Sequence, residues 1–154
     1  MRLGVKTLAL VVLFSATGIS YAGNVGPDEV KLVDGKIAMS LTGSNGDAAK
    51  GRDIFINRKQ GNCLACHVNK EISEQAFHGK VGPPLDGVAG RWDEAELRAI
   101  LVNSKKVLGE ETIMPSFYRL INGTRTMKKF KGKTILSAEQ VEDVLAYLKT
   151  LKEE

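Results

Sequence analysis

Two cysteines and a histidine stand together in the chain as Cys63-Leu64-Ala65-Cys66-His67. Two thiols three positions apart can each bond one vinyl group on the same edge of a porphyrin. The imidazole that directly follows the second thiol then lies beneath the ring, where it can reach an iron atom. This C-x-x-C-H spacing is the pattern of covalent haem attachment. The sequence therefore predicts one haem c, bound through Cys63 and Cys66, with His67 as an axial ligand of the iron.

Three other kinds of site use the same residue types. A thioredoxin-like redox pair would require an alternation of strands and helices that the sequence lacks. A zinc site would need His78 as a further ligand, and the adjacent Cys66 and His67 fit the usual ligand spacing poorly. A disulfide between the two cysteines leaves the neighbouring histidine without a role. Haem attachment is the favoured interpretation, and these three are its alternatives.

An iron atom held by His67 needs a second axial ligand, a water molecule or an open position. Met114 is the favoured ligand, because it lies in an apolar patch and Pro115 fixes the chain direction directly after it. Met127 stands beside charged residues and has no such constraint. A thioether opposite an imidazole raises the reduction potential of haem. It also leaves no vacant position for oxygen, which favours an electron carrier over a catalyst.

The other candidate ligands are weaker. Met39 precedes the expected domain. His78 follows His67 by only 11 positions, and its loop would have to double back around the ring edge. We interpret it as a solvated loop histidine.

A turn-rich loop follows the motif, from Gly82 to Arg91, with the sequence GPPLDGVAGR. The carbonyl of Pro83 in this loop can accept a hydrogen bond from the ring N–H of His67. Such a bond would fix the plane and the basicity of the imidazole. We therefore expect the loop to pack beneath the histidine.

The first residues carry the features of a secretory signal peptide. Arg2 and Lys6 give a positive start, and residues 8–14 are an unbroken apolar run. An uncleaved membrane anchor would need about 20 apolar residues, more than this segment supplies. We expect residues 1–22 to be removed by cleavage after Ala22.

The remaining sequence predicts a small all-α domain with long loops. Residues 23–45 have only scattered apolar positions, and we expect an N-terminal extension that is partly ordered at best. Helices are expected from about residue 47 to 58, from Asp93 and from Ser137, the last two beginning with capping boxes. The chain has 5 Phe, 3 Tyr and 1 Trp. This small aromatic supply suits a core partly filled by a cofactor.

The sequence resembles class I cytochromes c. Gly51 and Phe55 occupy the glycine and aromatic positions of that family's first helix, and residues 82–91 match its loop pattern G-P-x-L-x-G-x-x-G-R. The resemblance implies a cytochrome c domain over residues 46–154. It also implies that Pro83 bonds the haem-ligating histidine and that Arg91 lies near a haem propionate.

A narrower resemblance is to the SoxX family, the small haem subunits of the SoxAX cytochromes of bacterial sulfur oxidation. The similar segments fall in the same order, at residues 61–67, 90–92, 112–118, 130–133 and 136–144. The resemblance implies that Met114 is the distal ligand, in agreement with the argument from its surroundings.

The same resemblance implies a place in a complex. The chain would form a periplasmic heterodimer with a SoxA-like cytochrome, in an L-cysteine S-thiosulfotransferase that oxidatively couples thiosulfate to a cysteine of a SoxYZ-like carrier. Haem attachment would consume both cysteines, so no thiol and no catalytic residue would remain in this chain. Its expected role is to accept electrons and pass them to a soluble cytochrome.

Two other functions use the same motif. The chain could be a free-standing periplasmic monohaem cytochrome that shuttles electrons to a respiratory oxidase. A sensor or peroxidase would instead require an open iron position. The formal net charge of +4 is too small to indicate nucleic acid binding.

One stretch of the sequence is strongly basic. Between Glu111 and Glu139 there is no acidic residue, and six basic residues fall between Arg119 and Lys133. The stretch is either a surface that steers an acidic partner or a solvated loop. The sequence favours neither.

Overall fold

The computed structural model describes residues 23–153 of the chain. The expected signal peptide, residues 1–22, lies outside the described residues. None of the helices described is long and apolar enough to cross a membrane.

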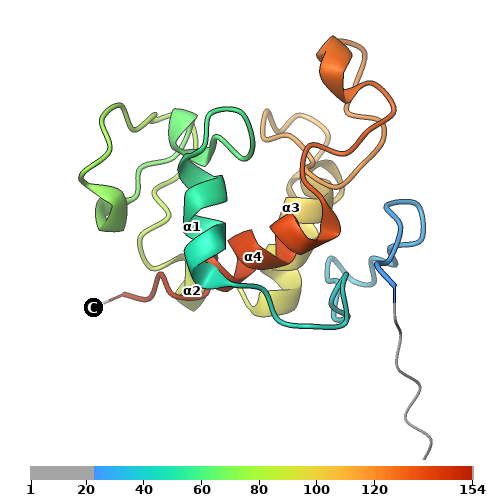
Figure 1. Cartoon of the computed structure of the whole chain (residues 1–154), viewed down its shortest axis with the longest axis horizontal. Helices are drawn as coiled ribbons and strands as arrows, with labels where there is room; N and C mark the ends of the chain where they lie inside the picture. Colours follow the sequence, from blue (N-terminus) through green and yellow to red (C-terminus); the bar gives the residue numbers. More distant parts are fainter. Residues whose placement is uncertain (1–22, 154) are drawn as a thin grey trace, which may run out of the picture.

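The described part of the chain is helical, as expected from the sequence (Figure 1). Its only β pairing is a single bridge between Val33 and Lys36. The α-helices are α1 (Ala48–Ile56), α2 (Val88–Arg91), α3 (Glu94–Leu108) and α4 (Ala138–Leu148). Short 3₁₀ turns are η1 (Cys63–Ala65), η2 (Lys70–Ile72) and η3 (Lys128–Phe130).

Side-chain caps begin the three longer helices. Asp47 accepts hydrogen bonds from the first backbone N–H groups of α1. Asp93 with Glu96 and Ser137 with Gln140 form the two capping boxes expected from the sequence, at the starts of α3 and α4. Each cap satisfies backbone donors that have no partner within the helix.

Helices α1 and α4 cross in direct backbone contact. A Cβ atom added at Gly51 would lie 1.9 Å from the carbonyl oxygen of Asp143. Beside this contact, the rings of Phe55 and Tyr147 pack edge to face, with centroids 5.4 Å apart. Gly51 therefore provides a flat surface on α1, and only a residue without a side chain fits there.

The N-terminal extension is packed against the helices through buried side chains and hydrogen bonds, contrary to our expectation of partial order. It is the blue segment that follows the grey trace in Figure 1. Ile37 and Leu41 are buried in the core. The backbone N–H of Ile37 donates to the carbonyl of Ala95, and the hydroxyl of Tyr118 donates to the carbonyl of Val25. The extension is therefore part of the folded domain.

A buried ion pair explains why the extension is held. Arg98 of α3 and Glu142 of α4 are almost fully buried, with Nε and Oε1 2.8 Å apart. The carbonyl of Ile37 accepts a hydrogen bond from Arg98, and the backbone N–H of Leu41 donates to Glu142. A buried ion pair is stable only when its remaining donors and acceptors are satisfied, and the extension supplies these partners.

The crossing of α1 and α4 gives a first prediction. We expect Gly51→Ala to lower the free energy of unfolding by about 1–3 kcal/mol, because the methyl group would press on the backbone of α4. Urea unfolding of the haem-loaded protein measures the change. The control is Gly90→Ala in α2, where an added Cβ meets nothing within 4 Å. Equal stability of the two variants would contradict the close contact.

Candidate functional site

A cavity of about 420 Å³ lies inside the helical framework, and the C-x-x-C-H motif forms one of its walls. Apolar side chains of α1, α3 and α4 form the inner walls. The loop around Pro83 and the segment around Met114 close two further sides. The residues that line the cavity include Cys63, Cys66, His67, Pro83, Arg91 and Met114. The structure therefore brings all six predicted site residues to one cavity.

His67 is held by the loop beneath it. Its Nδ1 lies 2.7 Å from the carbonyl oxygen of Pro83. Because a carbonyl oxygen can only accept, Nδ1 carries the proton, and Nε2 keeps its lone pair for a metal. A Cβ atom at Gly82 would lie 2.4 Å from Cε1 of the ring. The imidazole thus rests on bare backbone, which fixes its plane.

The loop beneath the histidine is itself anchored. The N–H of Gly82 donates to the carbonyl of Cys66 at 2.8 Å. Arg91 lies at the cavity wall, and its guanidinium donates to the carbonyls of Pro84 and Asp86, each at 2.7 Å. In this structure Arg91 therefore acts as a clamp on the loop.

A break in α3 positions the opposite wall. Asn103 has non-helical dihedral angles within α3, with φ −146° and ψ 71°. The carbonyls of Leu101 and Val102 then accept hydrogen bonds from the N–H groups of Phe117 and Tyr118. The kink therefore allows a later segment of the same chain, at Phe117 and Tyr118, to form hydrogen bonds with α3.

The segment that carries Met114 is tied to the second half of α3. The hydroxyl of the buried Ser104 donates to the carbonyl of Met114 at 2.7 Å. The ammonium of Lys105 donates to the carbonyl of Thr112. These bonds fix the backbone on both sides of Ile113, so that the Met114 side chain lines the cavity.

The weaker ligand candidates lie elsewhere. Met39 and Met127 are 65% and 62% exposed, and neither lines the cavity. His78 is half-buried, which corrects our expectation of a solvated histidine. Its Nδ1 accepts from the N–H of Asn69, and its Nε2 bonds the carbonyl of Ile72. Both ring nitrogens are therefore engaged in holding their own loop.

The alternatives to haem attachment find little support. Among residues 23–153, no group of three or more His, Cys, Asp and Glu side chains is arranged to hold a metal ion. Cys63 and Cys66 are not joined in a disulfide. Loss of hydration raises the pKa of the Cys63 thiol to about 12. A thiol of this kind is a poor attacking group for disulfide exchange.

Sequence reasoning missed three residues that shape the site. Gly82 appeared only as a letter of a loop pattern, although its missing side chain makes room for the imidazole. Asn103 and Ser104 were not singled out. A helix-breaking Asn in the middle of an apolar helical pattern was the available signal for the kink.

The chain was compared with known proteins. A family model described as cytochrome c matches residues 48–152. Among solved structures, a chain from the crystal structure of SoxXA from P. pantotrophus is 41% identical, with a TM-score of 0.78. The match covers 85% of this chain and 100% of that one.

Two curated relatives are more distant. They are cytochrome bc1 complex cytochrome c subunits from Corynebacterium diphtheriae and Corynebacterium efficiens, 29% and 28% identical. Each match covers 96% of this chain, but only 43% and 41% of the relative. The chain thus spans less than half the length of the curated relatives that it matches.

The cofactor follows from the motif, the cavity and the family match together. The two thiols lie at one edge of a large, mainly apolar cavity, beside an imidazole whose free nitrogen can bind iron. Covalent attachment suits a small protein that cannot enclose a haem completely. The chain carries one covalently bound haem c at Cys63, Cys66 and His67.

The placement of Met114 gives a second prediction. We expect Met114→Ala to remove the far-red sulfur-to-iron absorption band of the ferric protein, because no other methionine among residues 23–153 lines the cavity. Met127→Ala is the matched control and should keep the band. A band that survives the first change would exclude Met114 as the ligand.

The contact between Gly82 and His67 gives a third prediction. We expect Gly82→Ala to displace the imidazole and weaken its bond to Pro83, because the new methyl group overlaps the ring. The visible spectrum should then show a mixture of haem spin states in place of one low-spin form. Gly90→Ala, in the following helix α2 and in open space, should leave the spectrum unchanged.

Proposed function

The chain belongs to the cytochrome c family, and from this premise we propose that it is the electron-transfer haem subunit of a periplasmic SoxAX-type L-cysteine S-thiosulfotransferase. The observation that carries the proposal is the 41% identity to a SoxXA chain over the whole of that chain. In the complex, thiosulfate would be coupled oxidatively to a cysteine of a SoxYZ-like carrier protein. This subunit would accept the electrons and pass them on.

Haem c supplies reversible one-electron chemistry between ferric and ferrous iron. The residues of the chain restrict that chemistry to electron transfer. His67 and Met114 both line the cavity and offer an imidazole and a thioether, which would be the axial ligands. Two protein ligands would keep the coordination the same in both oxidation states, so that little atomic movement would accompany each electron. They also leave no position for a substrate.

The loop beneath His67 would tune the iron ligand. The carbonyl of Pro83 accepts a hydrogen bond from the Nδ1–H of His67. This bond raises the electron density that Nε2 offers to iron. Arg91 holds the loop in this position through two carbonyls, and its place at the cavity wall suits contact with a haem propionate.

The thiosulfate chemistry itself would belong to the partner. Both cysteines of this chain are used in haem attachment, so a reactive thiol must come from elsewhere. A SoxA-like cytochrome would provide it in a heterodimer. The cavity rim supports such an interface, because Val81 and Ile113 line it and are 63% and 74% exposed. Exposed apolar side chains gathered at one place are typical of protein contacts.

The location of the protein would be the periplasm. Haem attachment of the c type accompanies export, and residues 1–22 carry the pattern of a cleaved signal peptide. The physiological acceptor would be a soluble cytochrome in the same compartment.

The second candidate is a free-standing periplasmic cytochrome that delivers electrons to a respiratory oxidase. The curated relatives favour a respiratory role, since both are subunits of bc1 complexes. The SoxX-like assignment is better supported, because its identity is higher and extends over a complete chain.

Purification from the native cell separates the two functions and is our fourth prediction. We expect the tagged chain to copurify with a second haem-staining polypeptide from cells grown on thiosulfate. Deletion of the gene should abolish thiosulfate oxidation and leave growth on other substrates intact. A protein that purifies alone, with thiosulfate oxidation surviving its deletion, would favour the respiratory shuttle.

A further inference from the structure

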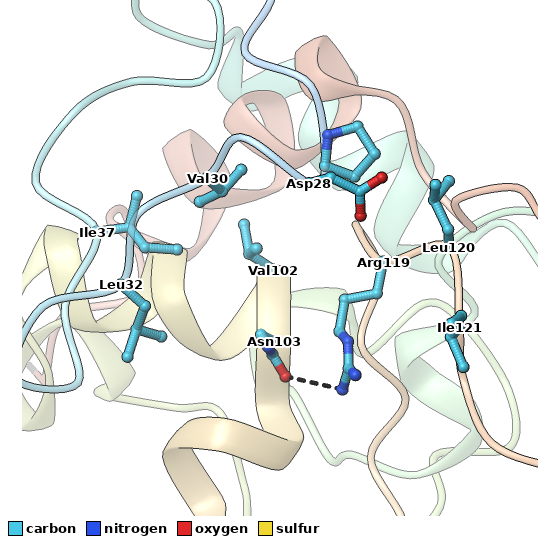
Figure 2. Close-up of a pocket in the computed structure, with 10 residues that line it drawn as sticks. Asp28, Val30, Leu32, Ile37, Val102, Asn103, Arg119, Leu120 and Ile121 are labelled. Atoms are coloured by element: carbon cyan, nitrogen blue, oxygen red, sulfur yellow. Dashed lines mark hydrogen bonds between the residues drawn. The ribbon is translucent and has the colours of Figure 1, made fainter.

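A second hollow lies on the side of α3 that faces away from the haem cavity. It is a cleft of about 250 Å³, with Val102 and Asn103 of α3 at its floor (Figure 2). Leu97 and Leu101 of the same helix line the haem cavity instead. The cleft and the haem cavity are therefore separated by α3.

The two side walls of the cleft come from distant parts of the sequence. Val30 and Leu32 of the N-terminal extension form one wall, and residues 119–121 form the other (Figure 2). The guanidinium of Arg119 donates to the side-chain oxygen of Asn103 at 3.2 Å, so this cation is held beside an apolar hollow. Ile121, on the same wall, is 73% exposed.

The wall that carries Arg119 continues into a projecting loop of residues 118–134, which we term the basic loop (Figure 1). The backbone N–H groups of Ile135 and Leu136 both donate to the carbonyl of Phe117. The two ends of the loop therefore meet at one residue. Inside the loop, the ammonium of Lys129 lies 4.4 Å from the ring centroid of Phe130.

Charge is segregated between this loop and the rest of the protein. The loop contains no acidic residue, and its basic residues are Arg119, Arg125, Lys128, Lys129, Lys131 and Lys133. Outside residues 1–22 and the basic loop, 14 basic and 18 acidic residues remain. The eight ion pairs found within residues 23–153 involve none of the six loop cations. The loop thus presents an uncompensated positive surface on an otherwise negative molecule.

We propose that the cleft and the basic loop form a docking surface for an acidic protein partner, with one apolar side chain of that partner inserted in the cleft. Interfaces of this kind combine a small apolar pocket that takes an anchor residue with a charged surround that guides the partner. Val30, Leu32 and Val102 provide an apolar part of the cleft for the anchor side chain. Asp28, Asn103 and Arg119 add polar groups to its lining, and the loop provides the charged surround. A surface for anionic lipid alone would need no concave pocket.

The position of this surface has a functional consequence. A partner that contacts the exposed rim of the haem cavity leaves the cleft free, because α3 lies between the two sites. The chain can therefore hold one protein at the haem cavity and receive an acidic protein at the basic loop. The inference rests on this surface and does not depend on the SoxAX assignment.

The test uses the haem-loaded protein, isotopically labelled for NMR, and an acidic heptapeptide with a central leucine between glutamates. The loop variant carries four substitutions, Lys128→Gln, Lys129→Gln, Lys131→Gln and Lys133→Gln. The control variant removes the same charge from other exposed sites, through Lys50→Gln, Lys59→Gln, Lys70→Gln and Lys152→Gln. Val30→Trp fills the cleft and leaves the loop charges in place. Vesicles of phosphatidylglycerol test for lipid binding.

We expect the peptide to shift amide signals of the cleft walls and the basic loop, and to bind at least about tenfold more weakly to the loop variant. The control variant should lose about twofold or less. Val30→Trp, and replacement of the peptide leucine by alanine, should each weaken binding as well. Equal losses in the loop and control variants would overturn the proposal, as would shifts confined to the cavity rim. Retention on vesicles without any peptide response at the cleft would also overturn it.

Discussion

The site depends on one imidazole being pressed against bare backbone. The two thioether bonds determine where the motif lies, but they do not determine how the ring of His67 is turned. Gly82 brings the loop into contact with the ring, and the carbonyl of Pro83 determines which nitrogen carries the proton. Arg91 in turn bonds two carbonyls of that loop. A short chain of contacts therefore links a surface loop to the electronic properties of the iron ligand.

The core of the domain is completed by its cofactor. Helix α4 packs against both α1 and α3, and the three helices line a cavity of about 420 Å³. The far wall of this cavity is formed by an irregular segment, and the break of α3 at Asn103 frees two helix carbonyls that accept hydrogen bonds from Phe117 and Tyr118 of this segment. The kink thus converts helical carbonyls into attachment points for the Met114 segment. Fold and redox site share the same hydrogen bonds.

Local sequence was sufficient where the physical requirement is local. Covalent attachment needs a contiguous motif, and the capping boxes of α3 and α4 lie within four residues, so both could be predicted. The ordered structure of the N-terminal extension could not be predicted, because its partners are remote in sequence. The backbone N–H of Leu41, for example, donates to Glu142, 101 positions away. The contact of Gly82 with the histidine ring likewise appears only when two segments are brought together. The burial of His78 was misjudged although its partners, Asn69 and Ile72, are only nine and six positions away, because the sequence does not show how the loop between them folds.

Hydrogen bonds between the N-terminal extension and α4 determine when the domain can form. Leu41 bonds Glu142, and Asn24 bonds Glu139, both across more than 100 positions. These bonds close only after nearly the whole polypeptide is available, and contacts of such long separation are slow to form. In a chain delivered with its N-terminus first, residues 24–41 must wait for α4. Acquisition of the final shape is therefore timed by the last helix, after the haem-attachment motif has already emerged.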